Sequence, residues 1–220
     1  MADLISSIDV PSITYGTPKQ AANGMRVPVH YNGAKLAVQL STSTADRQTI
    51  IFGLDHPDRP GLSASDASRC SLSVSVPAEA RRVLEGVDQA NVAAAHGNCA
   101  AWFKKTLDCD SVRDMYTPIV KLPAQEGRSP SVRLKVNLDG SYATKIQVVV
   151  SHVGDNIEWR PGGEADLVRG AQCIAVVETT GLWFLNKKFG MAISATSLLV
   201  WPPSIADSIA VFVELAALWT

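Results

Sequence analysis

The sequence lacks a surplus of charge of either sign. Twenty Lys and Arg residues stand against twenty-one Asp and Glu, which gives a formal net charge of -1, and charged residues make up only 19% of the 220 residues. About 25% is usual for a globular protein, so this surface carries few charges. A strongly basic protein that attracts nucleic acid through its overall field is therefore excluded, and any polyanion has to meet a local cluster of bases.

Closely spaced cysteines and long apolar runs are also missing. The four cysteines form no Cys-x-x-Cys pair and have no histidine at zinc-ligand spacing, which predicts free thiols and no structural zinc. No basic and apolar leader opens the chain, which predicts an intracellular protein that is not secreted. The longest apolar stretch, 205–219, contains Asp207 and Glu214. It is shorter than the roughly 20 residues of a membrane-spanning helix, so no membrane partner is expected.

Recognisable enzyme motifs are absent as well. The sequence has no Gly-x-Ser-x-Gly elbow, no phosphate-binding loop, no Gly-x-Gly-x-x-Gly and no His-Glu-x-x-His. Asp108 and Asp110 lie where a helix is expected to begin, and there they cap the helix more simply than they hold a cation. We expect a protein that is not an enzyme and that has no metal and no cofactor.

Alternating apolar and polar residues predict short strands on both sides of a helical segment. Asn32-Gly33 predicts a hairpin turn, because both central residues of a type I′ turn need a positive φ. Asp139-Gly140 is a second turn signal of this kind, and it predicts that 132–138 pairs with 143–150. The other expected strands lie at 12–15, 25–31, 35–40, 49–54, 70–76, 171–178, 182–185 and 193–201, and a loop is expected through 154–163.

Between these strands, helical spacing begins at Pro77 and a second helix ends before Pro118. The order predicts a mainly β fold with helical insertions, in which the strands form a closed or partly closed antiparallel barrel followed by a C-terminal helix. We divide the chain into an N-terminal arm (1–11), one barrel domain (12–203) with a helical insertion around 77–117, and a C-terminal apolar helix (204–220).

The C-terminal segment is apolar nearly all round a helix that begins after Pro202-Pro203-Ser204. Such a helix does not remain in water, so it either packs into its own core or docks onto another subunit or partner. The second alternative predicts a homo-oligomer and leaves open a structural or scaffolding protein, such as a virion or assembly component, that self-associates through 204–220.

Aromatic residues followed by a lysine pair occur twice, as Trp102-Phe103-Lys104-Lys105 and as Trp183-Phe184 ahead of Lys187-Lys188. Single-stranded nucleic acid binds to this combination, because bases stack on aromatic faces for about 1–3 kcal/mol each while lysines neutralise phosphates. The alternative is structural, with the aromatic pairs as core anchors and the lysine pairs in solvated turns.

A third basic segment runs from Lys121 to Lys145, with five bases against two acids. Arg133 and Lys135 are expected on one face of a strand, away from the apolar residues between them. A basic strand face of this kind forms a groove for a polyanion or an ordinary solvent-exposed face.

Several motifs occur in a recognisable order along most of the chain. They are Tyr-Gly-Thr-Pro-Lys (15–19), the hairpin 27–40, Phe-Gly-Leu (52–54), Trp-Phe-Lys-Lys (102–105), Tyr-Thr-Pro-Ile-Val-Lys (116–121), Val-Arg-Leu-Lys-Val (132–136) and Gly-Leu-Trp-Phe-Leu-Asn-Lys-Lys-Phe-Gly (181–190). In this order the chain resembles the single-stranded DNA-binding proteins of nucleocytoplasmic large DNA viruses, which are similar to the replication proteins of short-tailed phages.

The resemblance implies an OB-fold barrel that coats single-stranded DNA without sequence preference, self-associates, and works beside replication proteins such as a polymerase or helicase. It implies a viral protein of DNA replication, recombination or repair. Its phosphate-binding residues would be Lys104, Lys105, Lys121, Arg133, Lys135, Lys187 and Lys188. Its stacking platforms would be Trp102, Trp183 and Phe184.

Overall fold

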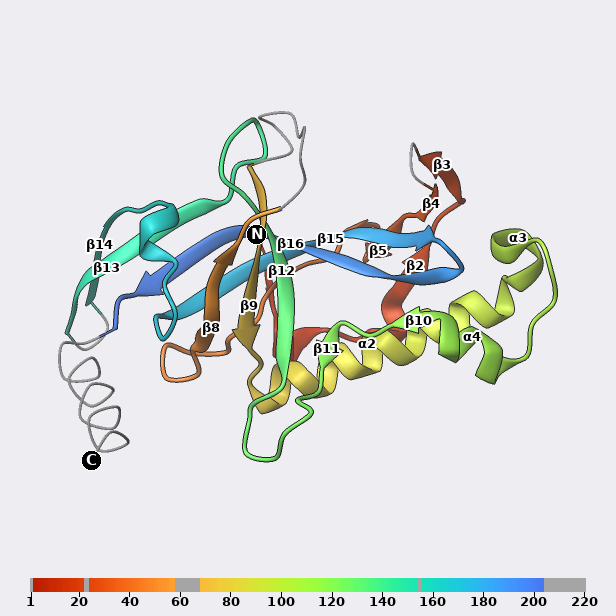
Figure 1. Cartoon of the computed structure of the whole chain (residues 1–220), viewed down its shortest axis with the longest axis horizontal. Helices are drawn as coiled ribbons and strands as arrows, with labels where there is room; N and C mark the ends of the chain where they lie inside the picture. Colours follow the sequence, from red (N-terminus) through yellow and green to blue (C-terminus); the bar gives the residue numbers. More distant parts are fainter. Residues whose placement is uncertain (1, 22–23, 58–67, 154–155, 204–220) are drawn as a thin grey trace, which may run out of the picture.

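The structure is a computed structural model that describes residues 2–21, 24–57, 68–153 and 156–203. Its fold is mainly β, with the helices grouped along one side of the strands (Figure 1). The predicted C-terminal helix at 204–220 lies outside the described residues. Among the described helices, none is long and apolar enough to cross a membrane. The helices are α2 (Ala78–Gly97), α3 (Cys99–Phe103) and α4 (Cys109–Met115), with 3-10 turns η1 (Ile5–Ser7), η2 (Val10–Ser12) and η3 (Glu164–Asp166).

Most strands belong to one large sheet, and a small sheet pairs the strands around the first hairpin. The strands of the large sheet are β1 (Asp3–Leu4), β3 (Lys19–Ala21), β4 (Gly24–Val27), β7 (Ala37–Gln39), β8 (Gln48–Asp55), β9 (Arg69–Ser75), β10 (Tyr116–Thr117), β11 (Val120–Lys121), β12 (Ser131–Asn137), β13 (Lys145–Val153), β14 (Asn156–Pro161), β15 (Gln172–Leu185) and β16 (Lys188–Trp201). Those of the small sheet are β2 (Ile13–Tyr15), β5 (Val29–Tyr31) and β6 (Ala34–Lys35).

Five strands of the large sheet pair in a closed cycle. β15 pairs with β8, β8 with β9, β9 with β12, β12 with β16, and β16 returns to β15. All of these pairings are antiparallel except that of β12 with β16, which is parallel. Inside the cycle the strands bury alternate apolar residues, for example Leu72, Val74, Leu134 and Ile193, which are between 0% and 6% exposed. This alternation leaves the other half of each strand's side chains on the outside of the cycle.

Helix α2 is joined to the strands by a chain of buried and partly buried hydrogen bonds. The Tyr15 hydroxyl donates to the Asn91 side-chain oxygen (2.8 Å), and the Asn91 amide donates to the Tyr116 hydroxyl (2.9 Å). Tyr116 in turn donates to Asp88 at 2.6 Å, and the backbone N–H of Ile119 donates to both Asp88 oxygens at 3.1 Å. Burial raises the pKa of Asp88 to about 6, although these hydrogen bonds favour its charged form.

The hairpin predicted at Asn32-Gly33 is confirmed. Asn32 and Gly33 have φ values of 50° and 79°, and they connect β5 to β6, which pair antiparallel. The positive φ at both central residues is what a type I′ turn requires. The expected strand at 70–76 is also confirmed, and α2 runs uninterrupted from Ala78 to Gly97.

The second predicted hairpin, at Asp139-Gly140, is wrong. The backbone N–H of Thr144 donates to the carbonyl of Asn137 (2.8 Å), so the residues between them form a closed loop. β12 already pairs with β9 along one edge and with β11 and β16 along the other. No edge of β12 is left for β13, and β13 instead continues along β16, parallel to it.

Two other expectations need correction. Residues 156–161, expected in a loop, form β14, which pairs antiparallel with β13. The segments 171–178 and 182–185, expected as separate strands, are parts of the single strand β15. The pairing register with β16 shifts between Thr179 and Leu182. The strand therefore continues across the residues between 178 and 182, where the sequence pattern predicted a break.

We predict that stability falls as pH rises because of Asp88. Its pKa is higher in the folded protein, about 6, than the ordinary value of 3.8, so the folded state binds the proton more tightly between these two values. The free energy of unfolding should therefore drop by about 2 kcal/mol between pH 4.5 and 7.5 through this group. Urea unfolding of Asp88→Asn should show a weaker decrease than the wild type.

Asp110→Asn is the matched control, because the Asp110 side chain is 87% exposed and forms an i,i+3 ion pair with Arg113. This variant should keep the pH dependence of the wild type. An Asp88→Asn curve parallel to that of the wild type would contradict the assignment.

Candidate nucleic-acid interface

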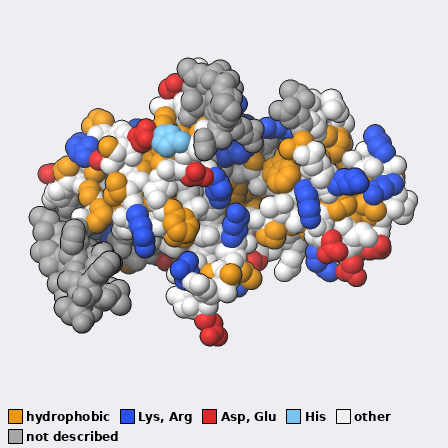
Figure 2. Space-filling view, in the orientation of Figure 1, with side chains coloured by type: hydrophobic (Ala, Val, Ile, Leu, Met, Phe, Trp, Pro, Cys, Tyr) orange, Lys and Arg blue, Asp and Glu red, His pale blue; other side chains and the backbone are white. Residues whose placement is uncertain are grey.

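The outward side of the strand cycle and of the neighbouring strands β3, β4 and β11 carries a set of basic side chains, which we call the basic face. Cross-strand register places them together: Lys19 lies opposite Arg26, Arg26 opposite Trp183, and Trp183 opposite Gly190 of β16. Further along β16, Ser194 lies opposite Lys135 of β12. Figure 2 shows Lys and Arg side chains spread along the side of the molecule in view, with several Asp and Glu side chains grouped near α4 and others scattered over this side. The basic face consists of Lys19, Arg26, Arg69, Lys121, Arg133, Lys135 and Lys188.

A groove of about 750 Å³ lies in the middle of the basic face. We call it the central groove. Three of its cations, Arg26, Arg69 and Lys135, come from β4, β9 and β12, which are far apart in the sequence. Tyr142, in the loop after β12, also lines the groove and is 83% exposed. Ser194 and Thr196 also line the groove, and the hydroxyl groups of such residues donate and accept hydrogen bonds.

The charges of the central groove repel one another. Burial and the nearby positive charges of Arg26 and Arg69 lower the pKa of Lys135. Among the described residues, two acids line the groove: Glu178, which is engaged by Lys35 at 3.3 Å, and Asp139. An anion placed beside Lys135 would offset the repulsion that Arg26 and Arg69 exert on it.

Arg133 lies next to Lys135 on the same strand face, as predicted, but its charge is already engaged. Its guanidinium donates to the carboxylate of Asp55 and, at 2.7 Å, to the hydroxyl of Ser71. Lys121 is exposed on β11 opposite Ser131, at the other end of the same face of β12. Lys135 is thus the predicted base that lines the central groove.

The two aromatic-lysine segments meet at a second hollow, which we call the aromatic pocket. It has a volume of about 500 Å³ and lies between α3 and the turn that joins β15 to β16. Asn186 and Lys187 form this turn with φ values of 49° and 61°, the conformation of a type I′ hairpin. The predicted residues that line the pocket are Trp102, Lys104, Phe184, Lys187 and Lys188.

Trp102 and Phe184 form the buried wall of this pocket. They are 6% and 9% exposed, and their ring centroids lie 5.6 Å apart in an edge-to-face contact. Phe184 also stacks on Phe189 at 5.2 Å. A nucleic-acid base needs an accessible ring face, so in this structure both rings serve as core anchors. Trp183 differs from them, because it is partly exposed on the basic face and its ring lies beside Gly190.

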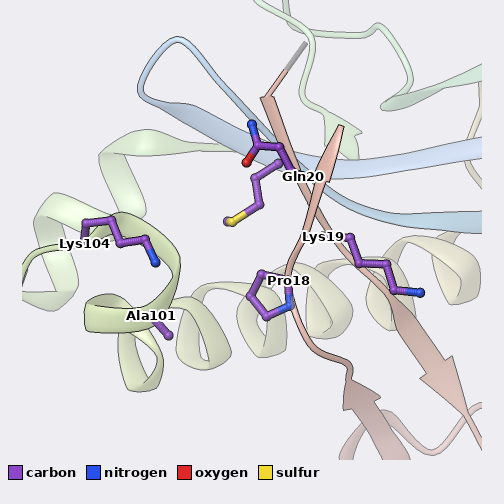
Figure 3. Close-up of a pocket in the computed structure, with 6 residues that line it drawn as sticks. Pro18, Lys19, Gln20, Ala101 and Lys104 are labelled. Carbon is purple, nitrogen blue, oxygen red and sulfur yellow. The ribbon is translucent and has the colours of Figure 1, made fainter. Parts of the chain in front are cut away.

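The predicted lysines around the pocket are all exposed, but they differ in their contacts. The Lys188 ammonium donates to the backbone carbonyl of Asp114 at 2.7 Å, near the end of α4. Lys104 has a φ of 59° and ends α3, and Lys105 follows it. Lys104 also lines a smaller hollow of about 340 Å³ beside β3, where its side chain extends from α3 into the space that Gln20 borders on the other side (Figure 3).

Four bases that sequence reasoning missed are Lys19, Arg26, Lys35 and Arg69. Arg26 stands between the apolar Met25 and Val27 in an expected strand. This alternation of apolar and polar residues could have placed Arg26 on the outward face of the strand. Lys19 and Lys35 lie in the motifs 15–19 and 27–40 but were given no role there, and nothing local distinguished Arg69. Within the described ranges, no group of three or more His, Cys, Asp or Glu side chains is placed to hold a metal ion.

Comparison with solved structures gives distant similarities. A single-stranded DNA-binding protein from bacteriophage Enc34 with a C-terminal truncation matches with a TM-score of 0.43 and 8% identity, over 87% of this chain and 96% of that chain. The same phage protein without that truncation matches at 0.40 and 12% identity, over 84% and 88%. Its complex with single-stranded DNA matches at 0.40 and 10% identity, over 84% and 94%.

No curated protein matches the chain. A family model does match, over residues 61–208, and its description is that of a family of unknown function, DUF5871. This match covers well over half of the chain, which therefore belongs to that family.

Proposed function

We propose that this protein binds single-stranded DNA on the basic face and that it does so without catalysis. The observation that carries the proposal is the convergence of Arg26, Arg69 and Lys135 on one groove beside the exposed ring of Tyr142. Cations bind backbone phosphates, and an exposed ring stacks on a base only when that base is unpaired. The combination favours a single strand over a duplex.

We further propose that the closed cycle of five strands is an OB-type barrel. The antiparallel pairings and the one parallel pairing, of β12 with β16, support this assignment. β15 and β16 have 14 residues each, which extends them over about 45 Å at roughly 3.3 Å per residue. We expect a binding site of about 4–16 nucleotides, the range known for OB folds.

In this proposal the central groove and the aromatic pocket have different roles. The central groove holds phosphates through its cations and a base through Tyr142. At the aromatic pocket, Lys104, Lys187 and Lys188 contribute charge, while Trp102 and Phe184 hold the elements that carry these lysines. A role in viral DNA replication, recombination or repair, inside the cell and beside replication proteins, would follow from this activity, as the resemblance to viral single-stranded DNA-binding proteins implies.

The first test is the salt dependence of binding to a mixed-sequence oligonucleotide. Each phosphate contact with a single strand contributes about 0.7 to the slope of log K against log salt concentration. Lys135→Ala should weaken binding and make this slope shallower by about 0.7 in a fluorescence anisotropy titration. Arg82→Ala, which removes one exposed charge from α2, is the control and should leave the slope unchanged.

The titration also decides the class of ligand. A duplex of the same length should bind more weakly than the single strand, and a single-stranded RNA serves as the competitor. No measurable affinity for single-stranded DNA at low salt would rule out the proposed function. A preference for the duplex would do the same.

The second test uses the lowered pKa of Lys135. A phosphate beside this ammonium raises its pKa again, so DNA binding takes up a proton wherever the free protein has begun to lose it. Wild-type affinity should therefore decline as pH rises through the alkaline range. Lys135→Arg keeps its charge throughout that range and should show a smaller decline. Equal pH profiles for the two proteins would indicate that Lys135 does not contact a phosphate.

The third test concerns stacking by Tyr142. Tyr142→Ala should lower the affinity for single-stranded DNA by about 1–3 kcal/mol, the usual loss for one base-stacking ring. Tyr142→Phe keeps the ring and should bind like the wild type. If both variants lose the same affinity, the hydroxyl and not the ring face makes the contact.

A further inference from the structure

Strand β14 forms an open edge of the large sheet in the part of the chain that the structure describes. The backbone N–H of Gly162 donates to the carbonyl of Ile146 on β13 (3.0 Å). Backbone groups alternate in direction along a strand, so those of Glu158 and Arg160 point toward β13 as well. Those of Ile157, Trp159 and Pro161 point to the open edge, where Ile157 and Trp159 each offer a donor and an acceptor to another strand and Pro161 offers only its carbonyl.

Three apolar side chains are exposed around this edge. Trp159 in the middle of β14 is 50% exposed, and Val150 and Val153 of β13 are 60% and 74% exposed. Edges are normally protected by charged side chains, prolines or covering segments. In β14 the protecting residues are Glu158 and Arg160 on one face and Pro161 at the last position, while the Lys145 ammonium of β13 lies 5.8 Å from the centre of the Trp159 ring. Water-exposed apolar side chains beside unpaired backbone groups favour association with another strand.

We propose that β14 pairs with β14 of a second copy of this chain, antiparallel about a two-fold axis at Trp159. A two-fold contact uses the same patch on both copies, so the strand must be complementary to itself. With the axis at Trp159, Glu158 of each copy lies opposite Arg160 of the other. The two Trp159 rings lie side by side on one face, and Ile157 lies opposite Pro161 of the other copy.

Backbone direction and charge select this register among the possible ones. Registers that place the axis between two residues would pair an outward-pointing residue with an inward-pointing one, so their hydrogen bonds cannot form. An axis at Glu158 would bring the two Glu158 carboxylates together, and an axis at Arg160 would do so for the two guanidinium groups. Like charges directly opposite one another destabilise a strand pair.

Arg160 is already held in position for this contact. Its guanidinium donates to Asp166 at 2.7 Å and to the carbonyl of Pro161 at 3.0 Å. A guanidinium has five N–H donors, so others remain for Glu158 of the second copy. Asp166 belongs to η3. The Arg160 side chain remains 51% exposed although it pairs with Asp166.

The contact is short, five residues of β14 from each copy in this register, so it buries less surface than a permanent dimer. We therefore expect a reversible dimer that forms as concentration rises. The proposal does not depend on DNA binding, because none of its residues belongs to the basic face.

Charge reversal provides the test, with sedimentation velocity as the measurement over about 5 to about 200 µM. The wild type should approach twice the 23.5 kDa mass of one chain as concentration rises. Glu158→Arg and Arg160→Glu should each remain monomeric. The double variant Glu158→Arg/Arg160→Glu should dimerise again, because its charges are complementary in the reverse order.

A mixture of the two single variants gives the most discriminating measurement. One then presents two positive residues and the other two negative ones, so together they should form a dimer that neither forms alone. Glu126→Arg, which makes the same charge change in an exposed loop, is the control and should dimerise like the wild type. Circular dichroism and thermal melting check that each variant is folded.

Two outcomes would overturn the proposal. One is a wild type that stays monomeric over the whole concentration range. The other is a dimer that survives both single charge reversals, and its loss on removal of 204–220 would then assign the contact to that segment. DNA binding measured on the same variants keeps the two proposals separate, since Glu158 and Arg160 lie outside the central groove.

Discussion

The pairing of β15 with β16 is the contact on which the rest of this fold depends. One edge of this hairpin pairs with β4, β7 and β8, and the other pairs with β10, β12 and β13. Its turn needs a positive φ at both Asn186 and Lys187, which matches the twist of the two long strands. Gly181 is the other requirement. It has a φ of 100°, and a Cβ there would lie 2.4 Å from the carbonyl oxygen of Val27 on β4.

The arrangement of strands around the β15–β16 hairpin explains how a protein with a net charge of -1 can present a basic face. Strands from distant parts of the chain lie side by side on the hairpin, and each contributes one or two outward-facing bases. At physiological ionic strength a charge acts over about 8 Å, so a bound phosphate responds to the nearest cations and not to the total. The acids near α4 therefore weaken the field of the central groove little.

The strands and helices could largely be predicted from sequence, because alternation and turn geometry are local. The Asn32-Gly33 hairpin was predicted correctly since its two strands have free edges to share. Asp139-Gly140 carries the same signal, but both edges of β12 are occupied by partners that no local pattern reveals. β14 was missed because a glycine and proline run, Pro161-Gly162-Gly163, follows it and resembles a loop.

The candidate site was less predictable for the same reason. Lys135 was found because it alternates with apolar residues in one strand, but Arg26 and Arg69 join it only through pairing between distant strands. The two aromatic-lysine segments were recognised as similar, and the sequence also gave grounds for a structural role of their rings. That they meet at one pocket depends on α3 packing against the end of the β15–β16 hairpin, which is a tertiary contact.

Each aromatic-lysine segment combines a buried aromatic ring with exposed lysines. Trp102 and Phe184 pack together, so the end of α3 and the turn of the hairpin are held at a fixed separation. Tyr116 strengthens this arrangement, since β10 pairs with β16 at Phe189 while the Tyr116 hydroxyl is bound to Asp88 of α2. A buried network thus ties the helices to the strand edge that carries Lys188. In the proposed function, the buried rings support nucleic-acid binding without touching a base, because they fix the positions of the lysines.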